Sequence, residues 1–200
     1  MKATIFDYGA GNIHSLAKAL SSCGAVVTVE QDPIRALDTD VLVLPGVGAF
    51  GLAAERLAPG REVMRSALRD GLPCIGICLG MQLLFDDSDE APPNVLGLGL
   101  IAGRVTRLAA RRVPQIGWNS LDPLDDAMFA AAPLGFAYYA NSFVCRPSDC
   151  SVVRAWSTHE DDRFAAVVRA GRAIGVQFHP EKSSAPGLRF LRAILAEVSA

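Results

Sequence analysis

The chain has 200 residues, half of them hydrophobic, and a formal net charge of −2. This length suits one domain, and we expect a single domain over residues 1–200. The small net charge gives no basis for nucleic-acid or membrane-surface binding, and no apolar run approaches the roughly 18 residues that span a bilayer. The segment MKATIF resembles a first strand rather than a secretory signal, so a cytoplasmic location is expected.

The cysteines are odd in number and irregularly spaced: Cys23, Cys74, Cys78, Cys145 and Cys150. No two of them form a C-x-x-C pair, so the sequence predicts neither a zinc site nor a thioredoxin-like site, and we expect no metal and no cofactor. Without an export signal, the thiols are expected to be reduced. Most of them suit small core positions, which leaves one or two for chemistry.

Strand-like and helix-like segments alternate through the first 85 residues. The expected strands cover residues 3–6, 26–29, 40–44 and 74–77, and the expected helices cover residues 13–23, residues 53–70 with a break near 59–60, and the segment after residue 77. This alternation predicts an α/β fold with an open, mostly parallel twisted sheet and helices on both faces, as in flavodoxin-like proteins.

The second half contains shorter strand candidates separated by turn residues. They are expected to form an antiparallel or mixed extension of the sheet. The candidates cover residues 98–108, 115–121, 135–145, 151–157 and 164–170, and a buried strand at 173–178 and a helix at 185–198 follow them. The acidic, proline-rich segment 86–94 is expected to be a surface loop.

Cys78 lies where a predicted buried strand changes into a helix, in the sequence GICLGMQ. Gly76 and Gly80 flank it two residues to each side, which is the spacing of a nucleophile elbow with cysteine in place of serine. So tight a turn needs small flanking residues, and a helix N-terminus favours the thiolate. The Leu79 N–H would face a developing oxyanion. From this segment alone, a buried core cysteine is an equally good interpretation.

A cysteine nucleophile needs a base, and His179 is the histidine that directly follows a buried strand. If the two strands are neighbours and parallel, Cys78 and His179 meet at one sheet edge. Glu181 lies two residues further on and is placed to orient the imidazole. His14 and His159 are expected to be solvated. Taken singly, His179 and Glu181 would pass for surface residues; together with the elbow they predict a catalytic group.

A glycine-rich turn, PGVGAFG at 45–51, also follows a buried strand. It lacks the Lys and Ser/Thr of a phosphate-binding loop. We interpret it as a cradle of backbone amides in which the Val47 or Gly48 N–H completes an oxyanion hole, although a simple tight turn would have the same composition.

The segments GICLGMQ, PGVG and QFHPE together resemble the class I (triad) glutamine amidotransferases. More narrowly, the chain is similar to the glutaminase subunits of imidazole glycerol phosphate synthase, in histidine biosynthesis. The resemblance runs from Asp7 to the final helix, and its motifs are YGAGNIHSL (8–16), PGVGAFG (45–51), GICLGMQLLF (76–85), GWNSL (117–121) and QFHPEKSS (177–184).

This resemblance implies a reaction and a set of residues. Cys78 attacks the side-chain amide of L-glutamine, His179 moves protons, Glu181 orients His179, and glutamate leaves after a thioester is hydrolysed. The glutamine is held by Gln82, Glu90, Ser142 and Phe143.

The resemblance also implies a protein partner, a (β/α)₈-barrel cyclase subunit in a heterodimer. The cyclase combines the ammonia with a phosphoribulosyl-formimino aminoimidazole carboxamide nucleotide, and the products are imidazole glycerol phosphate and aminoimidazole carboxamide ribonucleotide. The residues that match partner-facing positions are Asn12, Trp118, Asn119 and Lys182.

Two positions depart from the family, which often has His where this chain has Gln115 and Asn141. Both amides retain hydrogen-bonding capacity but do not titrate, so no proton-transfer role is expected of either.

Three alternatives remain open at this point. One is a glutaminase subunit for another acceptor, in anthranilate, aminodeoxychorismate or pyridoxal phosphate synthesis, against which YGAGN and GWN argue. Another is a non-catalytic, flavodoxin-like interaction subunit, which would be expected to lack Cys78, His179 or Glu181. The last is a cysteine peptidase on the same fold.

Overall fold

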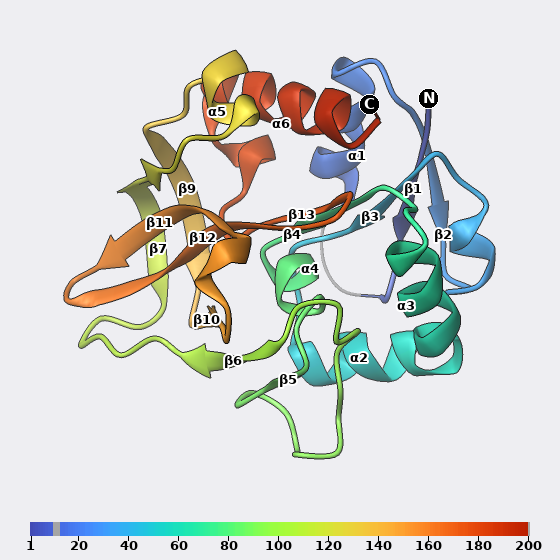
Figure 1. The fold of residues 1–200 in the computed structure, drawn as a ribbon, viewed down its shortest axis with the longest axis horizontal. Helices are drawn as coiled ribbons and strands as arrows, with labels where there is room; N and C mark the ends of the chain where they lie inside the picture. Colours follow the sequence, from blue (N-terminus) through green and yellow to red (C-terminus); the bar gives the residue numbers. More distant parts are fainter. Residues whose placement is uncertain (10–12, 200) are drawn as a thin grey trace.

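The computed structural model describes residues 1–9 and 13–199. Within them, the chain builds one eight-stranded sheet, a three-stranded sheet and a two-stranded sheet. The large sheet crosses the middle of the molecule, with helices above and below it (Figure 1).

The large sheet has the order β2-β1-β3-β4-β13-β12-β11-β8. Its first five strands are parallel to one another: β2 (Val26–Glu30), β1 (Lys2–Phe6), β3 (Val41–Leu44), β4 (Cys74–Ile77) and β13 (Ala173–Val176). The remaining three continue it in antiparallel fashion: β12 (Asp162–Ala170), β11 (Val153–His159) and β8 (Asp122–Pro123). The open, mostly parallel sheet predicted from the sequence is confirmed.

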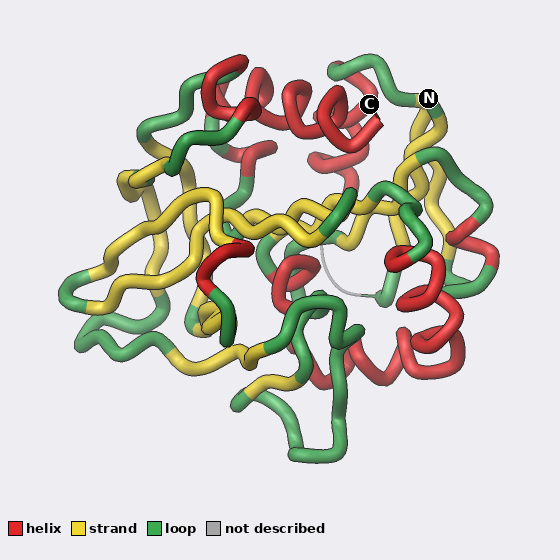
Figure 2. Tube along the Cα trace, viewed as in Figure 1, coloured by secondary structure: helices red, strands yellow, loops and turns green. Residues whose placement is uncertain are grey.

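The three central strands, β3, β4 and β13, consist of the tetrapeptides VLVL, CIGI and AIGV, and every residue in them is buried. Continuous apolar strands of this kind need cover on both faces of the sheet. One face is covered by α1 (Ile13–Ser22), α5 (Ala127–Ala131) and α6 (Ser184–Ser199), and the other by α2 (Phe50–Leu57), α3 (Arg61–Arg69) and α4 (Leu79–Gln82) (Figure 2). Two hydrophobic cores result, one on each side. The short 3-10 helices are η1 (Arg35–Leu37), η2 (Ala58–Gly60), η3 (Cys150–Val152) and η4 (Pro180–Lys182).

Not every strand candidate of the second half extends the large sheet. β10 (Phe143–Pro147), β6 (Gly103–Arg107) and β5 (Asp87–Ser88) form the three-stranded sheet, and β7 (Gln115–Ser120) pairs with β9 (Phe136–Asn141). The single strand expected at 135–145 is broken at Ser142, so its two halves pair in different sheets. This break forms part of the wall of the pocket described below.

The helix after Cys78 and the strand before β6 are both shorter than expected, for a shared reason. The carbonyl oxygens of Leu83, Leu84 and Phe85 accept hydrogen bonds from the backbone N–H groups of residues 98–101. These carbonyls are therefore bonded to another segment, α4 ends at Gln82, and residues 98–101 pair with that loop rather than with a strand.

Candidate active site

Cys78 and His179 leave the same edge of the large sheet. Cys78 directly follows β4, and His179 comes three residues after β13. These strands are parallel neighbours in which Val176 is paired with Ile77. The carboxyl ends of such strands are where open α/β sheets place binding sites.

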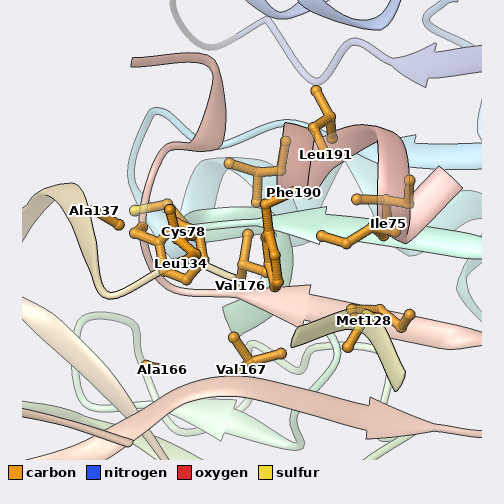
Figure 3. Packing of buried hydrophobic residues seen from close by; sticks show 14 of the residues in the cluster. Ile75, Cys78, Met128, Leu134, Ala137, Ala166, Val167, Val176, Phe190 and Leu191 are labelled. Atoms are coloured by element: carbon orange, nitrogen blue, oxygen red, sulfur yellow. The ribbon is translucent and has the colours of Figure 1, made fainter. Parts of the chain in front are cut away.

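The backbone at Cys78 is strained. Its φ is 48° and its ψ is −102°, a conformation that side chains other than glycine rarely adopt. The Cys78 N–H donates to the Val176 carbonyl at 2.7 Å, which ties the turn to β13. Only 5% of the residue is exposed, and it belongs to the core cluster drawn in Figure 3.

The tight turn depends on the two glycines that flank the cysteine. A Cβ atom at Gly76 would lie 2.7 Å from the carbonyl carbon and oxygen of Gly80. A Cβ atom at Gly80 would collide with the Leu44 carbonyl group. Both contacts are with backbone, which cannot rotate away as a flexible side chain does, so the sequence G-x-C-x-G is a packing requirement of this strand-to-helix turn.

We expect Gly80→Ala to lower the free energy of unfolding by about 3 kcal/mol, because the new methyl group meets backbone rather than a movable side chain. For a chain of this size the melting temperature should fall by roughly 6–12 °C, measurable by calorimetry. Gly51→Ala is the matched control: its Cβ meets only the Ala91 Cβ, at 3.7 Å, inside helix α2, where alanine is favoured. Equal melting temperatures for the two variants would contradict the packing argument.

His179 is held from both its backbone and its ring. Its N–H donates to the Tyr138 carbonyl at 2.8 Å, and its carbonyl accepts from the Ser183 hydroxyl at 2.7 Å. Ring Nδ1 lies 2.8 Å from Glu181 Oε1, and since a carboxylate only accepts, Nδ1 carries the proton. The side chains of His179 and Glu181 are 1% and 7% exposed. Nε2 is left to serve Cys78.

The environment favours a protonated imidazole. Burial lowers the pKa of His179, but hydrogen bonds to Cys78 and Glu181, together with the negative charges of both groups, raise it by more, to about 9. An imidazolium beside a cysteine sulfur stabilises the thiolate and provides an acid for a leaving group. Cys74, four residues earlier, is the contrast: burial raises the pKa of its thiol to about 12, so it stays protonated.

Cys78 and His179 open into a pocket of about 250 Å³. All seven residues predicted for the oxyanion hole and for glutamine binding line it: Val47, Gly48, Leu79, Gln82, Glu90, Ser142 and Phe143. The remaining lining residues are Gly46, Ala140, Asn141 and Lys182. Glu90, expected in a surface loop, therefore faces the pocket from the three-stranded sheet's side of the molecule.

The glycine-rich turn at 45–51 is fastened at both ends. The buried Tyr8 hydroxyl donates to the Pro45 carbonyl, and the Phe50 N–H donates to Glu90 Oε2 at 2.9 Å. Between these anchors, a Cβ atom at Gly46 would lie 3.0 Å from His179 Cε1, so the turn packs directly against the imidazole.

The geometry has a counterpart among known proteins. The family model described as Glutamine amidotransferase class-I matches residues 4–197. The chain belongs to the class-I glutamine amidotransferase family. It is 44% identical over 193 residues to the imidazole glycerol phosphate synthase subunit HisH of Thermus thermophilus, covering 96% of this chain and 95% of the relative. It is 42% identical over 196 residues to HisH of Halobacterium salinarum, covering 94% and 89%.

Solved structures of class-I glutamine amidotransferases share the fold at low sequence identity. A structure described as glutamine amidotransferase matches with a TM-score of 0.77 at 20% identity, covering 99% of both chains. A glutamine amidotransferase from Thermotoga maritima matches with a TM-score of 0.70 at 17% identity, covering 100% of this chain and 98% of its own.

The four residues predicted to face a partner do not form one group in this amidotransferase. Lys182 lines the pocket, whereas Trp118 is 55% exposed on β7. The Asn119 amide donates to the Thr158 carbonyl at 2.9 Å, so it contributes to joining β7 and β11. Asn12 lies outside the described residues. No helix within residues 1–9 and 13–199 has the length and apolar character needed to cross a membrane.

The two departures from the family lie together. Gln115 and Asn141 are directly paired across β7 and β9, and both are 4% exposed. In the described part of the chain, neither amide atom of Gln115 has a hydrogen-bond partner, nor has Asn141 Oδ1. His14 is exposed, and the ring of His159 bonds to the Arg112 carbonyl at 2.8 Å, so both are placed apart from the pocket lining.

Sequence reasoning missed one residue of the site. Gln177 is wholly buried, and its amide Nε2 lies 3.4 Å from Cys78 Sγ. It stands in the QFHPE segment two residues before His179, and a polar residue at the end of an otherwise apolar strand was the available signal. The described residues gather no group of three His, Cys, Asp or Glu side chains able to hold a metal ion.

Proposed function

We propose that this amidotransferase is the glutaminase subunit of imidazole glycerol phosphate synthase, and that residues 1–200 form one functional domain. The observation that carries the proposal is the grouping of Cys78, His179 and Glu181 at one pocket, in a chain 44% identical to a HisH subunit. The relatives' name favours this acceptor over anthranilate, aminodeoxychorismate or pyridoxal phosphate synthesis.

The reaction consumes glutamine and water and yields glutamate and ammonia. The Cys78 thiolate attacks the amide carbon of glutamine, and the carbonyl oxygen becomes an oxyanion. His179 gives its proton to the nitrogen, the C–N bond breaks, and ammonia leaves behind a thioester. The neutral imidazole then takes a proton from water, which attacks the thioester and releases glutamate. Glu181 keeps the Nδ1 proton in place throughout.

The pocket lining supplies the other roles. The N–H groups of Leu79 and of the Val47–Gly48 turn stabilise the oxyanion. Gln82, Glu90, Ser142 and Phe143 hold the substrate, where the Glu90 carboxylate suits an ammonium group. The strained turn at Cys78 supports this assignment, because strain of this kind persists at sites where it positions a reacting group.

The proposed partner is a barrel cyclase subunit, joined in a cytoplasmic heterodimer that receives the ammonia. Trp118 supports a protein contact, since a large aromatic side chain 55% exposed near a pocket is typical of interfaces. Asn12, Asn119 and Lys182 complete the proposed contact set.

The decisive experiment is co-purification with the barrel cyclase, followed by a glutaminase assay with and without the acceptor nucleotide. We expect a stable complex whose glutamine hydrolysis rises when the nucleotide is added. Fast hydrolysis by the lone chain, unchanged by cyclase and nucleotide, would count against the synthase assignment while leaving the glutaminase chemistry intact.

A further inference from the structure

Beside the proposed Cys–His–Glu group, a second set of side chains reaches Cys78 from the opposite direction. Gln177 Nε2 donates to Cys78 Sγ at 3.4 Å, and Gln177 Oε1 accepts from Gln82 Nε2 at 3.4 Å. The same Gln82 nitrogen donates to the Phe143 carbonyl at 3.1 Å. Gln177 and Gln82 are 0% and 4% exposed, so water does not compete for these bonds.

The direction of each bond in this relay follows from its far end. A backbone carbonyl only accepts, so the Gln82 group that faces Phe143 must be its NH₂. That NH₂ also faces Gln177, which therefore presents its oxygen to Gln82 and its own NH₂ to sulfur. The Phe143 carbonyl thus fixes an N–H donor on Cys78 through two amides.

The backbone holds this donor firmly. The Gln177 N–H donates to the Ala166 carbonyl at 2.9 Å, and the next residue, Phe178, is fully buried in the core. A donor fixed in this way favours a sulfur that carries negative charge, because a thiolate accepts hydrogen bonds far better than a thiol.

We propose that Gln177 is a positioning residue that holds the Cys78 sulfur as an oriented thiolate through the Phe143–Gln82–Gln177 relay. The proposal rests on the proposed function of Cys78 as the nucleophile. His179 supplies the proton for the leaving group, whereas Gln177 has no proton to exchange and acts only through the sulfur. It therefore affects the rate of attack more than the binding of glutamine.

The test is site-resolved alkylation of Cys78 by iodoacetamide across a pH series, read by peptide mass spectrometry. Gln177→Met keeps the length and removes the donor, and Gln177→Glu keeps the shape and replaces the donor with an acceptor. We expect the midpoint of the alkylation profile to move to higher pH, by about one pH unit for Met and by more for Glu, which is about tenfold less thiolate per unit. The exposed Cys150 in the same samples is the internal control and should not change.

Other charged and titratable groups also surround the sulfur, and they stay constant in this series. They are His179, Glu181, Tyr8, Cys145, Lys182 and Glu90. Gln115→Met is the matched variant, because it removes a buried amide of the same size that bonds to none of these groups among the described residues. Its Cys78 midpoint should equal that of the unaltered protein.

In the complex with the cyclase, both Gln177 variants should lose about tenfold or more in kcat for glutamine, with KM within about threefold. If either variant fails to fold, Gln82→Met tests the relay from its other end and should also raise the midpoint. An unchanged midpoint in folded Gln177→Met and Gln177→Glu, or in Gln82→Met, would overturn the proposal. A failed glutaminase assignment would show differently, as hydrolysis that survives loss of Cys78.

Discussion

Replacement of Cys78 by alanine should abolish glutamine hydrolysis and leave the fold intact. Removal of the nucleophile from an acyl-transfer site lowers kcat by about 10⁴-fold or more. The cyclase should still form its product from free ammonium, because the pocket at Cys78 only generates ammonia. The measurement is product formation by the complex, with glutamine and with an ammonium salt as alternative nitrogen donors.

Cys74→Ala is the control for this variant. Cys74 lies four residues earlier, is fully buried on β4, and has its thiol kept protonated by burial. Its loss should cost some stability and little activity. The assignment of Cys78 would be wrong if the Cys78→Ala complex hydrolysed glutamine at the rate of the Cys74→Ala complex.

Replacement of His179 by asparagine should lower kcat/KM by about 10²- to 10⁴-fold. Asparagine retains a hydrogen-bonding amide but neither donates a proton to the leaving nitrogen nor stabilises the thiolate by charge. Steady-state assays of the complex with glutamine measure this loss. An asparagine variant with near-normal kcat/KM would show that another group moves the proton.

The unaltered protein should show the same dependence as a function of pH. The pKa of His179 is raised to about 9, so its proton is present below that pH and is lost above it. We therefore expect kcat/KM to fall as pH rises through about 9. The contribution of the imidazolium to stability follows the same sign: it is complete below about 6.5, the pKa of a free imidazole, and is lost as pH rises through about 9.

Glu181→Gln offers a sharper check on that origin. It keeps a hydrogen-bond acceptor at Nδ1 and removes the negative charge that helps to raise the pKa of His179. The alkaline fall of kcat/KM should move toward neutral pH in this variant. A fall that stays at about 9 would assign it to a different group.

The sequence predicts the site well where function coincides with the end of a strand. Cys78 and His179 follow short, fully apolar segments, and such segments pack in parallel at the centre of a sheet, so their chain ends meet. Glycine spacing around Cys78 is equally readable, because backbone crowding leaves no other residue type at Gly80.

Contacts between distant segments are what local patterns do not contain. The break at Ser142 arises because its flanking strands find partners in two different sheets. The early end of α4 arises because residues 98–101 bind the carbonyls of residues 83–85. Neither competition leaves a mark in the periodicity of either segment, and the amide relay through Gln177 is hidden in the same way.

The strand β9 has a mechanical consequence. It is paired with β7, which bears the exposed Trp118, and its Tyr138 carbonyl accepts from the His179 N–H. At its far end, the chain passes through residues 140–143, the pocket wall. A force applied at the outer two-stranded sheet therefore acts on the imidazole and on the substrate cavity through one short rod, without a hinge or a lid between them.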